Sequence, residues 1–376
     1  MAKVMLIGGV AESLLGFRGQ LLQDMVAHGH EVIACAPNAK AQIITRLKNI
    51  GVDYQDFPLH RTGINPLQDL RSIWVFVRLF RKIRPDVVLN YTIKPTIYGS
   101  MAATIAKVTN ISSMITGLGY AFSKSSLKQR LVGQVATLLY RVGLRSNKVV
   151  FFQNPDDLAL FCALGIVTER NHPTLIGGSG IDLNYFSVCP LPQTASFLLI
   201  ARLIREKGVC EYVEAARQLH KKYPKARFCL VGMVDSNPSA IRSEDIDEWS
   251  RAGFIEFLGR LEDVRPAIAD SSVFVLPSYR EGVSHATLEA MAMGRPIITT
   301  DAPGCRETVV EGLNGFLVPI MDTDALANAM ERFILDPSLS EAMGEQSRLL
   351  AADRFDVRTV NHIIMKNLEL INEAVA

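Results

Sequence analysis

The sequence predicts an α/β protein with two Rossmann-like domains, each a doubly wound parallel sheet. Short apolar runs alternate with longer segments of helical periodicity along the whole chain. Such alternation is typical of parallel strands covered by helices on both faces. A chain of 376 residues is also too long for one compact core, which favours two domains.

The first domain is expected to begin with a strand at residues 3–8 that ends in a glycine turn, Gly8 and Gly9. The further strands are expected at 31–35, 86–90, 111–115, 148–152 and 174–176. The helices expected between them include 15–28, 66–83, 95–107 and 126–143.

The second domain is expected to repeat the pattern after a glycine-rich boundary near Gly177–Asp182. Its strands are expected at 196–200, 227–232, 255–258, 273–276, 297–299 and 316–318. The last segment is amphipathic and predicts a terminal helix. We therefore expect an N-terminal domain at 1–180, a C-terminal domain at 181–355 and a final helical segment at 356–376.

Two glutamates follow the strand expected at 273–276. Glu281 lies in the loop after it and precedes Gly282, and Glu289 follows eight residues later on a helix that ends at Gly294. In open parallel sheets, ligands bind beyond the carboxyl ends of the strands, where such loops lie. This spacing alone is also compatible with a solvated helix face.

A basic segment follows the strand expected at 196–200 in the same way, with Arg202, Glu206, Lys207 and Gly208. Fixed cations beyond a strand can neutralise a diphosphate. They then favour a transition state in which negative charge builds up on a departing diphosphate. The structural alternative is a basic loop capped by the next helix.

These segments together resemble the retaining glycosyltransferases of family 4, whose GT-B fold places two Rossmann-like domains facing a cleft. Glu281 and Glu289 match the paired glutamates of that family. Residues 201–208 resemble its G-R-L-x-x-E-K-G segment, with Ala201 in place of the first Gly. Three weaker matches follow the family's order at 177–186, 302–307 and 312–319.

The resemblance implies roles for the matched residues. Glu281 would face the donor sugar, and Arg202 and Lys207 would neutralise the donor diphosphate. Glu289 would hold the ribose, since a carboxylate can accept hydrogen bonds from both vicinal hydroxyls. His285 would either contact the donor or only orient its loop. The other donor-binding candidates are Gly282, Val283, Ser284, Gly9 and Gly180.

Candidates for binding the acceptor or a phosphate lie in the first domain. Arg18 is expected at the start of a helix, whose amides favour anions, although a surface arginine is the alternative. Lys94, Thr116 and Gly117 each follow an expected strand. Many family members have a histidine near the sugar C6. Residues 90–99 contain none, which leaves the recognition of that carbon open.

The closest resemblance within the family is to bacterial enzymes that extend glycans on a polyprenyl diphosphate, and it is carried by segments 276–282, 301–305 and 232–238. It implies a UDP-sugar donor, with N-acetylgalactosamine or a related HexNAc first, and a polyprenyl-diphosphate-linked saccharide as acceptor. Three alternatives stay open. They are a lipopolysaccharide-core or other soluble acceptor, a UDP-sugar 2-epimerase or hydrolase on the same fold, and a catalytically idle membrane-bound scaffold.

Charge is distributed unevenly between the two halves. Residues 1–182 contain 20 Lys and Arg against 11 Asp and Glu, whereas the remainder contains 20 against 27. Basic residues interleaved with apolar ones at 71–84 and 124–148 predict helices that can lie on an anionic inner-membrane surface. Core-facing helices with a solvated basic face are the alternative. No nucleic-acid-binding motif accompanies the charge, so nucleic acid is not an expected partner.

No metal or cofactor is expected. The two Asp-x-Asp sequences, at 322–324 and 245–247, are interpreted as a helix cap and a solvated helix face. The first glycine turn is not G-x-G-x-x-G, which argues against a dinucleotide-dependent dehydrogenase.

The cysteine pattern and hydropathy predict the location. Six cysteines without metal-ligand spacing indicate reduced thiols in the cytoplasm. The N-terminal apolar run is too short for a signal peptide, and no uninterrupted apolar run reaches the length of a membrane span. We expect a cytoplasmic protein that associates peripherally with the inner face of the cytoplasmic membrane.

Overall fold

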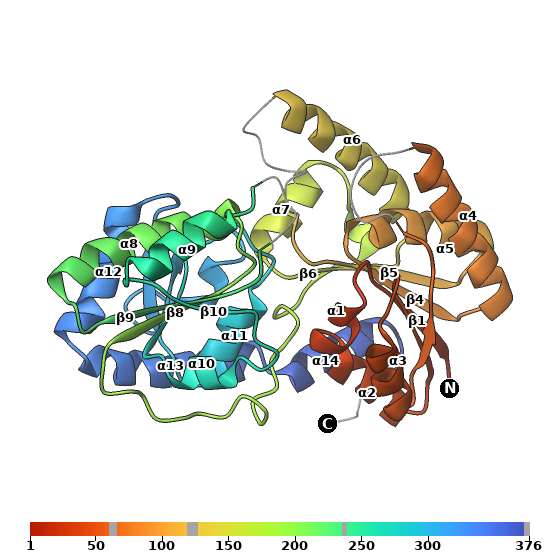
Figure 1. The fold of residues 1–376 in the computed structure, drawn as a ribbon. Coiled ribbons are helices and arrows are strands. Elements are labelled where there is room, and N and C mark those ends of the chain that lie inside the picture. Colours follow the sequence, from red (N-terminus) through yellow and green to blue (C-terminus); the bar gives the residue numbers. More distant parts are fainter. Residues whose placement is uncertain (60–65, 119–126, 235–238, 372–376) are drawn as a thin grey trace. The chain divides into compact units, whose positions relative to one another are not determined.

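The computed structural model describes residues 1–59, 66–118, 127–234 and 239–371 (Figure 1). The chain forms two compact units, and each is described separately. Unit 1 contains Met1–Ser179 and Val357–Ala376, and unit 2 contains Gly180–Asp356. Each border lies one residue from the border expected from the sequence.

Unit 1 is built on a seven-stranded parallel sheet in the order β3-β2-β1-β4-β5-β6-β7. The order reverses between β1 and β4, because the chain passes outward through β2 and β3 and then returns to the other side of β1. The strands are β1 (Lys3–Ile7), β2 (Glu31–Cys35), β3 (Asp53–Gln55), β4 (Val87–Tyr91), β5 (Asn110–Ile115), β6 (Val149–Phe152) and β7 (Pro173–Leu175).

Helices cover both faces of this sheet, as the sequence predicts. Val4 and Leu6 of β1 pack in the same buried cluster as Leu21 of α2, whereas Met5 and Ile7 pack on the opposite face with Phe76 of α4. The helices are α1 (Glu12–Gly16), α2 (Gly19–Ala27), α3 (Ala41–Asn49), α4 (Pro66–Ile83), η1 (Pro95–Gly99), α5 (Ser100–Ala106), α6 (Leu127–Leu144), α7 (Pro155–Ala163), η3 (Glu169–Asn171) and α14 (Val357–Asn367).

Two expected helices differ from the structure. The helix expected at 15–28 is divided into α1 and α2 at Phe17 and Arg18. Gly16 and Gly19 flank this break, and glycine is unfavourable in a helix interior. The helix expected at 95–107 starts as the π-helical segment η1 before α5. Such segments occur frequently at functional sites.

The terminal helix α14 belongs to unit 1. The Asn361 amide donates a hydrogen bond to the Asp24 carboxylate of α2 at 2.7 Å. The Asn110 amide of β5 donates to the Leu368 carbonyl at 3.0 Å. The end of the chain therefore completes the helical layer on one face of the unit 1 sheet.

Unit 2 is built on a six-stranded parallel sheet in the order β10-β9-β8-β11-β12-β13, which reverses between β8 and β11. The strands are β8 (Ser196–Ile200), β9 (Arg227–Val231), β10 (Glu256–Gly259), β11 (Val273–Leu276), β12 (Ile297–Thr300) and β13 (Gly315–Val318). Between and after them lie η4 (Arg205–Lys207), α8 (Val209–Lys222), α9 (Ser243–Arg251), α10 (Arg265–Ala269), α11 (His285–Ala292), η5 (Arg306–Thr308), α12 (Thr323–Leu335) and α13 (Ser338–Arg354). The two doubly wound sheets predicted from the sequence are therefore confirmed.

Two arginines fix the segment that enters unit 2. Arg295 is fully buried and donates hydrogen bonds only to main-chain carbonyls, those of Cys189, Pro190, Ile268, Ala269 and Met293. Arg348 donates to the carbonyls of Leu183 and Phe186 and of Ala292. Because these carbonyls include the ends of α10 and α11, the arginines also stabilise the helix C-termini.

None of the helices in the described part of the chain combines the length and hydrophobicity that a bilayer span requires.

Candidate active site

The candidate residues of unit 2 lie where its strand order reverses. Arg202 and Lys207 follow β8, and Glu281 follows β11, the strand beside β8. Open α/β sheets bind ligands beyond the carboxyl ends of two such strands. The structure therefore brings both predicted segments to one edge of the sheet.

Lys207 and Glu281 form an ion pair at this edge. The Lys207 ammonium donates to Glu281 Oε1, and the two side chains are 18% and 10% exposed. Ser278 Oγ donates to the same carboxylate oxygen at 2.7 Å. A charge buried alone would be costly, whereas in the pair each side chain offsets the charge of the other in a partly desolvated site.

Close backbone contacts hold the loop of Glu281. The Glu281 amide donates to the Pro303 carbonyl at 2.9 Å. A Cβ on Gly304 would lie 2.2 Å from the Glu281 carbonyl oxygen, and one on Gly208 would lie 2.1 Å from the Pro277 carbonyl oxygen. Only glycine fits at both positions, so the loops after β8, β11 and β12 pack without intervening side chains.

Helix α11 carries the second predicted glutamate, Glu289. Ser284 caps the helix by accepting a hydrogen bond from the Thr287 amide at 3.3 Å. His285 Nε2 lies 3.6 Å from Glu289 Oε1. Burial raises the pKa of the Glu289 carboxyl to about 8, and the charge of Asp263 adds to this effect. Glu289 is therefore largely protonated at neutral pH when no ligand is bound.

The remaining candidates of unit 2 differ in position. Arg202 is exposed at the start of its loop, and Gly282 and Val283 are buried beside Glu281. Gly180 lies instead at the border of the unit, directly before Ile181, whose amide donates to the Phe355 carbonyl. Its φ of 72° favours glycine there for conformational reasons alone.

The sequence interpretation missed the residues that link the two loops. The Tyr279 hydroxyl donates to Glu211 of α8 at 2.6 Å, and its amide donates to the Glu206 carbonyl at 2.9 Å. Ser278, the donor to Glu281, could have been found as the first polar residue after the buried strand β11. The Tyr279–Glu211 contact joins separate elements, so no local sequence pattern predicts it.

Gly9, Arg18 and Lys94 of unit 1 also lie where the strand order reverses, after β1 and β4. A Cβ on Gly8 would lie 2.2 Å from the Tyr91 ring, so this turn has no room for a side chain. The Gly9 amide donates to Thr92 Oγ1 at 3.0 Å. Thr92 has a φ of 67°, an unfavourable conformation for a β-branched residue. Such strain is concentrated at functional sites.

Arg18 is buried beside this turn, with 2% of its surface exposed, so its interpretation as a surface arginine is wrong. Its guanidinium carbon lies 5.4 Å from the centre of the Tyr91 ring. Its Nε is buried and has no hydrogen-bond partner among the described residues. Burial lowers the pKa of Arg18 to about 10. A buried cation without a carboxylate is suited to receive an anionic ligand.

The other unit 1 candidates are Lys94, which is already paired with a carboxylate, and Thr116 and Gly117, which come shortly before residues outside the described part of the chain. Lys94 donates to Asp69 of α4 at 3.0 Å, with 15% and 9% of the side chains exposed, so its charge is already neutralised. Thr116 and Gly117 are half-buried after β5. They come shortly before residues 119–126, which lie outside the described residues, as do the start of the basic segment 124–148 and part of segment 232–238.

The two Asp-x-Asp sequences have structural roles. Asp322 accepts a hydrogen bond from the Ala325 amide at 2.8 Å and caps α12, and Asp245 pairs with Arg242 on α9. Both placements agree with the sequence interpretation. Within the described residues, no three His, Cys, Asp or Glu side chains gather as a metal site would require.

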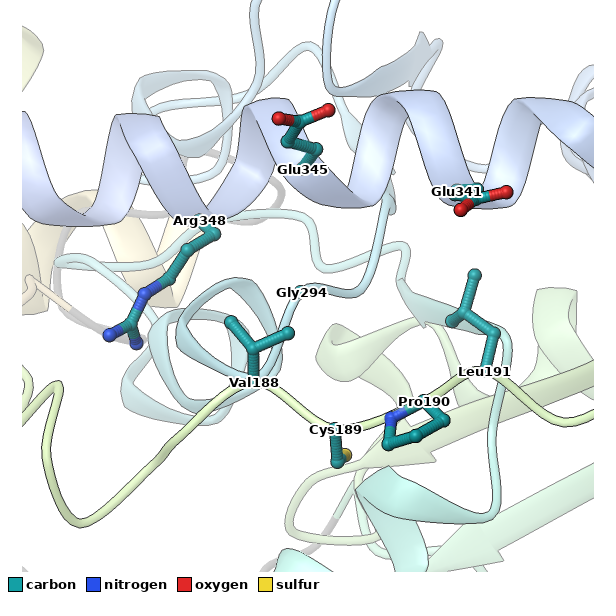
Figure 2. Close-up of a pocket in the computed structure, with 8 residues that line it drawn as sticks. All are labelled: Val188, Cys189, Pro190, Leu191, Gly294, Glu341, Glu345 and Arg348. Carbon is teal, nitrogen blue, oxygen red and sulfur yellow. The ribbon is translucent and has the colours of Figure 1, made fainter.

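A hollow of about 630 Å³ lies elsewhere in unit 2 (Figure 2). Figure 2 shows Glu341 and Glu345 on helix α13, while Val188 to Leu191 run past it as an extended segment. The predicted donor residues do not line this hollow. It forms where the entering segment, held by Arg295 and Arg348, passes α13.

Two protein-family profiles match the chain. The glycosyl transferases group 1 profile matches residues 194–336, and the glycosyl transferase 4-like domain profile matches residues 17–175. The first match contains the Lys207 and Glu281 loops, and the second contains Arg18 and Lys94.

Two curated bacterial proteins are similar over most of their length. One is the N,N'-diacetylbacillosaminyl-diphospho-undecaprenol alpha-1,3-N-acetylgalactosaminyltransferase of Campylobacter jejuni, which is 25% identical over 87% of this chain and 88% of its own. The other is the UDP-Gal:alpha-D-GlcNAc-diphosphoundecaprenol alpha-1,3-galactosyltransferase of Escherichia coli. It is 24% identical over 78% of each chain.

The solved structure of Anabaena HepE in complex with UDP and glucose has the same fold. It superposes with a TM-score of 0.78 and 20% identity over 99% of this chain and 100% of its own. Together with the two profile matches, this confirms the predicted fold class and family. The chain belongs to the group 1 glycosyltransferases with family-4-like domains, and it has the GT-B fold.

Proposed function

We propose that the enzyme transfers N-acetylgalactosamine, or a related HexNAc, from a UDP-sugar to a polyprenyl-diphosphate-linked saccharide with retention of configuration. The observation that carries the proposal is the Lys207–Glu281 pair at the strand reversal of unit 2. The names of the two relatives support the finer assignment. Both describe acceptors linked to diphospho-undecaprenol, and one names a UDP-sugar donor.

The donor would bind beyond the carboxyl ends of β8 and β11. Glu289 would accept hydrogen bonds from the ribose hydroxyls, for which its carboxylate must be ionised. Glu281 would orient the hydroxyls of the sugar, while Arg202 and Lys207 would lie against the diphosphate. Main-chain groups of Gly282 and Val283, the capped turn at Ser284, His285 and the Gly9 turn complete the proposed donor contacts.

The proposed reaction breaks the bond between the sugar C1 and the β-phosphate oxygen and forms a bond from C1 to the acceptor hydroxyl oxygen on the same face. The acceptor proton passes to the departing phosphate oxygen, so no protein nucleophile is needed. Negative charge accumulates on UDP as the bond breaks. Lys207 and Arg202 lower the barrier because they stabilise this charge more in the transition state than in the bound donor.

The acceptor side of the proposal uses unit 1. Arg18 is the first candidate for a phosphate of the acceptor, because it is a buried cation with no carboxylate partner among the described residues. Lys94 would bind a phosphate only by exchanging Asp69 for it. Thr116 and Gly117 would line the same edge after β5. No metal is required in this scheme, because arginine and lysine provide the positive charge.

A lipid-linked acceptor would bring the enzyme to the inner face of the cytoplasmic membrane. The excess of basic residues in unit 1 would favour peripheral association with anionic lipids there. This association is part of the proposal and follows from the acceptor chemistry.

The proposal is tested by a mass-spectrometric transfer assay in EDTA. Purified enzyme is incubated with a panel of UDP-sugars and a short-chain polyprenyl-diphosphate-linked HexNAc. We expect one HexNAc mass to be added to the lipid with a single preferred donor. UDP-sugar consumption without any acceptor would favour an epimerase or hydrolase instead. Transfer only to a lipopolysaccharide core would overturn the proposed acceptor, and transfer only after Mn²⁺ or Mg²⁺ is restored would overturn metal independence.

A further inference from the structure

Three helices of unit 1 leave an apolar hollow of about 490 Å³ on their outer surface, within the size range of small-molecule sites. Its α4 residues follow the spacing of one helix face, so α4 presents an apolar stripe to it. We call this the α4–α5–α6 hollow. It is lined by Leu70, Ile73, Trp74 and Val77 of α4, by Met101, Thr104 and Ile105 of α5, and by Val142, Arg145 and Ser146 at the end of α6.

The lining is unusually exposed for large apolar side chains. Trp74 is 57% exposed, Leu70 53% and Ile105 50%. The adjoining side of α4 is buried against the sheet through Phe76, Val77 and Phe80. Leu70 and Trp74 thus extend the apolar surface of α4 beyond the part that the core buries. Contiguous exposed patches of this kind mark interaction sites.

The rim of the hollow is cationic. Arg145 lines it, and Arg71 and Arg78 line an adjoining hollow of about 500 Å³ that shares Leu70 and Trp74. These three arginines are exposed, and none has a carboxylate partner among the described residues. The chain contains no Asp or Glu between Asp86 and Asp156. Apolar lining with a cationic rim fits an amphiphile that has a hydrocarbon chain and phosphates.

The hollow begins beside the candidate acceptor residues. Leu70 directly follows Asp69, the partner of Lys94 in the loop after β4. From there the lining continues along α4 to Val77, which spans roughly 10 Å at the helical rise of 1.5 Å per residue. A headgroup held near Lys94 would therefore lead its hydrocarbon chain along this groove.

We propose that the α4–α5–α6 hollow receives the prenyl chain of the lipid acceptor. The proposal rests on the proposed function and deepens it, because it assigns the lipid part of the acceptor to named residues. A groove between three helices encloses a single chain, whereas contact with a bilayer surface needs only a convex apolar face. The bound prenyl chain covers the Trp74 and Ile105 side chains.

The test uses fluorescence from Trp74. The protein has only two tryptophans, so the Trp249→Phe variant reports on Trp74 alone. Farnesyl diphosphate is titrated into this variant as a soluble prenyl probe. We expect a saturable blue shift of the emission, with at least tenfold weaker binding in Ile105→Gln. Leu138→Gln is the matched control, since Leu138 is an equally exposed α6 residue, at 58%, that does not line the hollow.

Other results would overturn the proposal. Equal affinity for dodecyl phosphate would indicate a site for any hydrocarbon chain. A response to anionic vesicles alone, weakened equally by Ile105→Gln and Leu138→Gln, would indicate flat membrane contact. A blue shift that follows protein concentration would indicate a second copy of the chain. Prenyl binding without transfer to a polyprenyl diphosphate would support the hollow as a prenyl site and overturn the proposed acceptor. Transfer without prenyl binding would overturn the role of the hollow and leave the proposed acceptor in place.

Discussion

The two units place their candidate residues at equivalent positions but in opposite electrostatic states. In unit 2, Lys207 and Glu281 neutralise each other after β8 and β11. In unit 1, Arg18 is buried after β1 without a carboxylate partner among the described residues. A paired site can be rigid and stable before any ligand arrives. A buried lone cation is instead a cost to stability that an anionic ligand removes.

The loop backbones of the two units differ in the same way as their charges do. Glycines allow the unit 2 loops to pack closely around Glu281. In unit 1, Thr92 is strained and the π-helical segment η1 interrupts the regular structure after β4. We interpret unit 2 as a preorganised donor site and unit 1 as an acceptor site that is completed by its ligand.

The largest effect is expected for Glu281→Gln, which breaks the pair. Turnover should fall about a hundredfold or more, as for loss of one preorganised transition-state contact. The variant removes the sugar-orienting charge and leaves Lys207 without its counter-charge. Initial rates with saturating UDP-sugar measure the effect. Glu345→Gln, an exposed glutamate of α13, is the control and should retain wild-type rates; equal rates in both variants would refute the assignment.

Arg18→Met tests whether the unpaired buried cation of unit 1 serves acceptor binding at a cost to stability. The KM for the acceptor should rise about tenfold to a hundredfold, the loss of a charge-assisted hydrogen bond of about 1.5–3 kcal/mol. The Tm should stay constant or rise, because an unpaired buried cation is removed. Kinetics and thermal unfolding are measured together, with the exposed Arg46→Met as control. A large fall in Tm with an unchanged KM would make Arg18 a structural residue.

A smaller, pH-dependent effect is expected at Glu289. Its pKa of about 8 means that binding of the ribose must release a proton below that pH. Affinity for UDP-N-acetylgalactosamine should therefore increase as the pH rises from 7 to 8, by about fivefold, and then level off. Calorimetry measures this profile. It should become flat in Glu289→Gln, whereas a profile that survives in this variant would show that a group other than Glu289 releases the proton.

The Glu289 carboxyl should also affect the free energy of unfolding, which falls rather than rises as the pH increases. Its pKa is higher in the folded than in the unfolded chain, so its stabilising contribution is full at acidic pH and is lost as the pH rises through about 8. Glu289→Gln should thus gain stability relative to the wild type at pH 9 but not at pH 5. Denaturant unfolding at both values checks this, and an equal difference at both would contradict the pKa shift.

The smallest effect on turnover is expected for Arg295→Met, which tests the rigidity of unit 2. Loss of its guanidinium removes the donor to five buried or part-buried main-chain carbonyls and should cost about 3 kcal/mol or more of unfolding free energy. The turnover of the folded enzyme should stay unchanged. Chemical unfolding and active-site-titrated rates measure both, with exposed Arg251→Met as control. A large fall in turnover would link the entering segment to the chemistry.

Much of the fold could be predicted from the sequence because central strands are continuous apolar runs. β8 and β11 have the expected bounds, and α4 likewise matches its predicted range. The edge strand β3, Asp53–Gln55, was missed because its half-exposed polar residues form no such run. The division of α1 from α2 was missed because the glycines at 16 and 19 act only as weak local signals.

The candidate site was only partly predictable. Local motifs locate Glu281 and Lys207, and their places at the ends of adjacent strands bring them together. The burial of Arg18 beside Tyr91 depends on a contact between β4 and the start of α2, which no local pattern indicates. The ion pair of Lys94 with Asp69 likewise joins separate elements. Sequence spacing therefore finds the paired donor residues more readily than the state of the acceptor residues.

Lys207 and Glu281 act as one unit in the proposed mechanism, and a double-mutant cycle tests this coupling most directly. The turnover of Lys207→Met, Glu281→Gln and the double variant is compared at saturating donor and acceptor. We predict that the double variant loses no more than the worse single variant, because each single change already disables the pair. Losses that multiply would show that the two residues act independently and would contradict the preorganised pair.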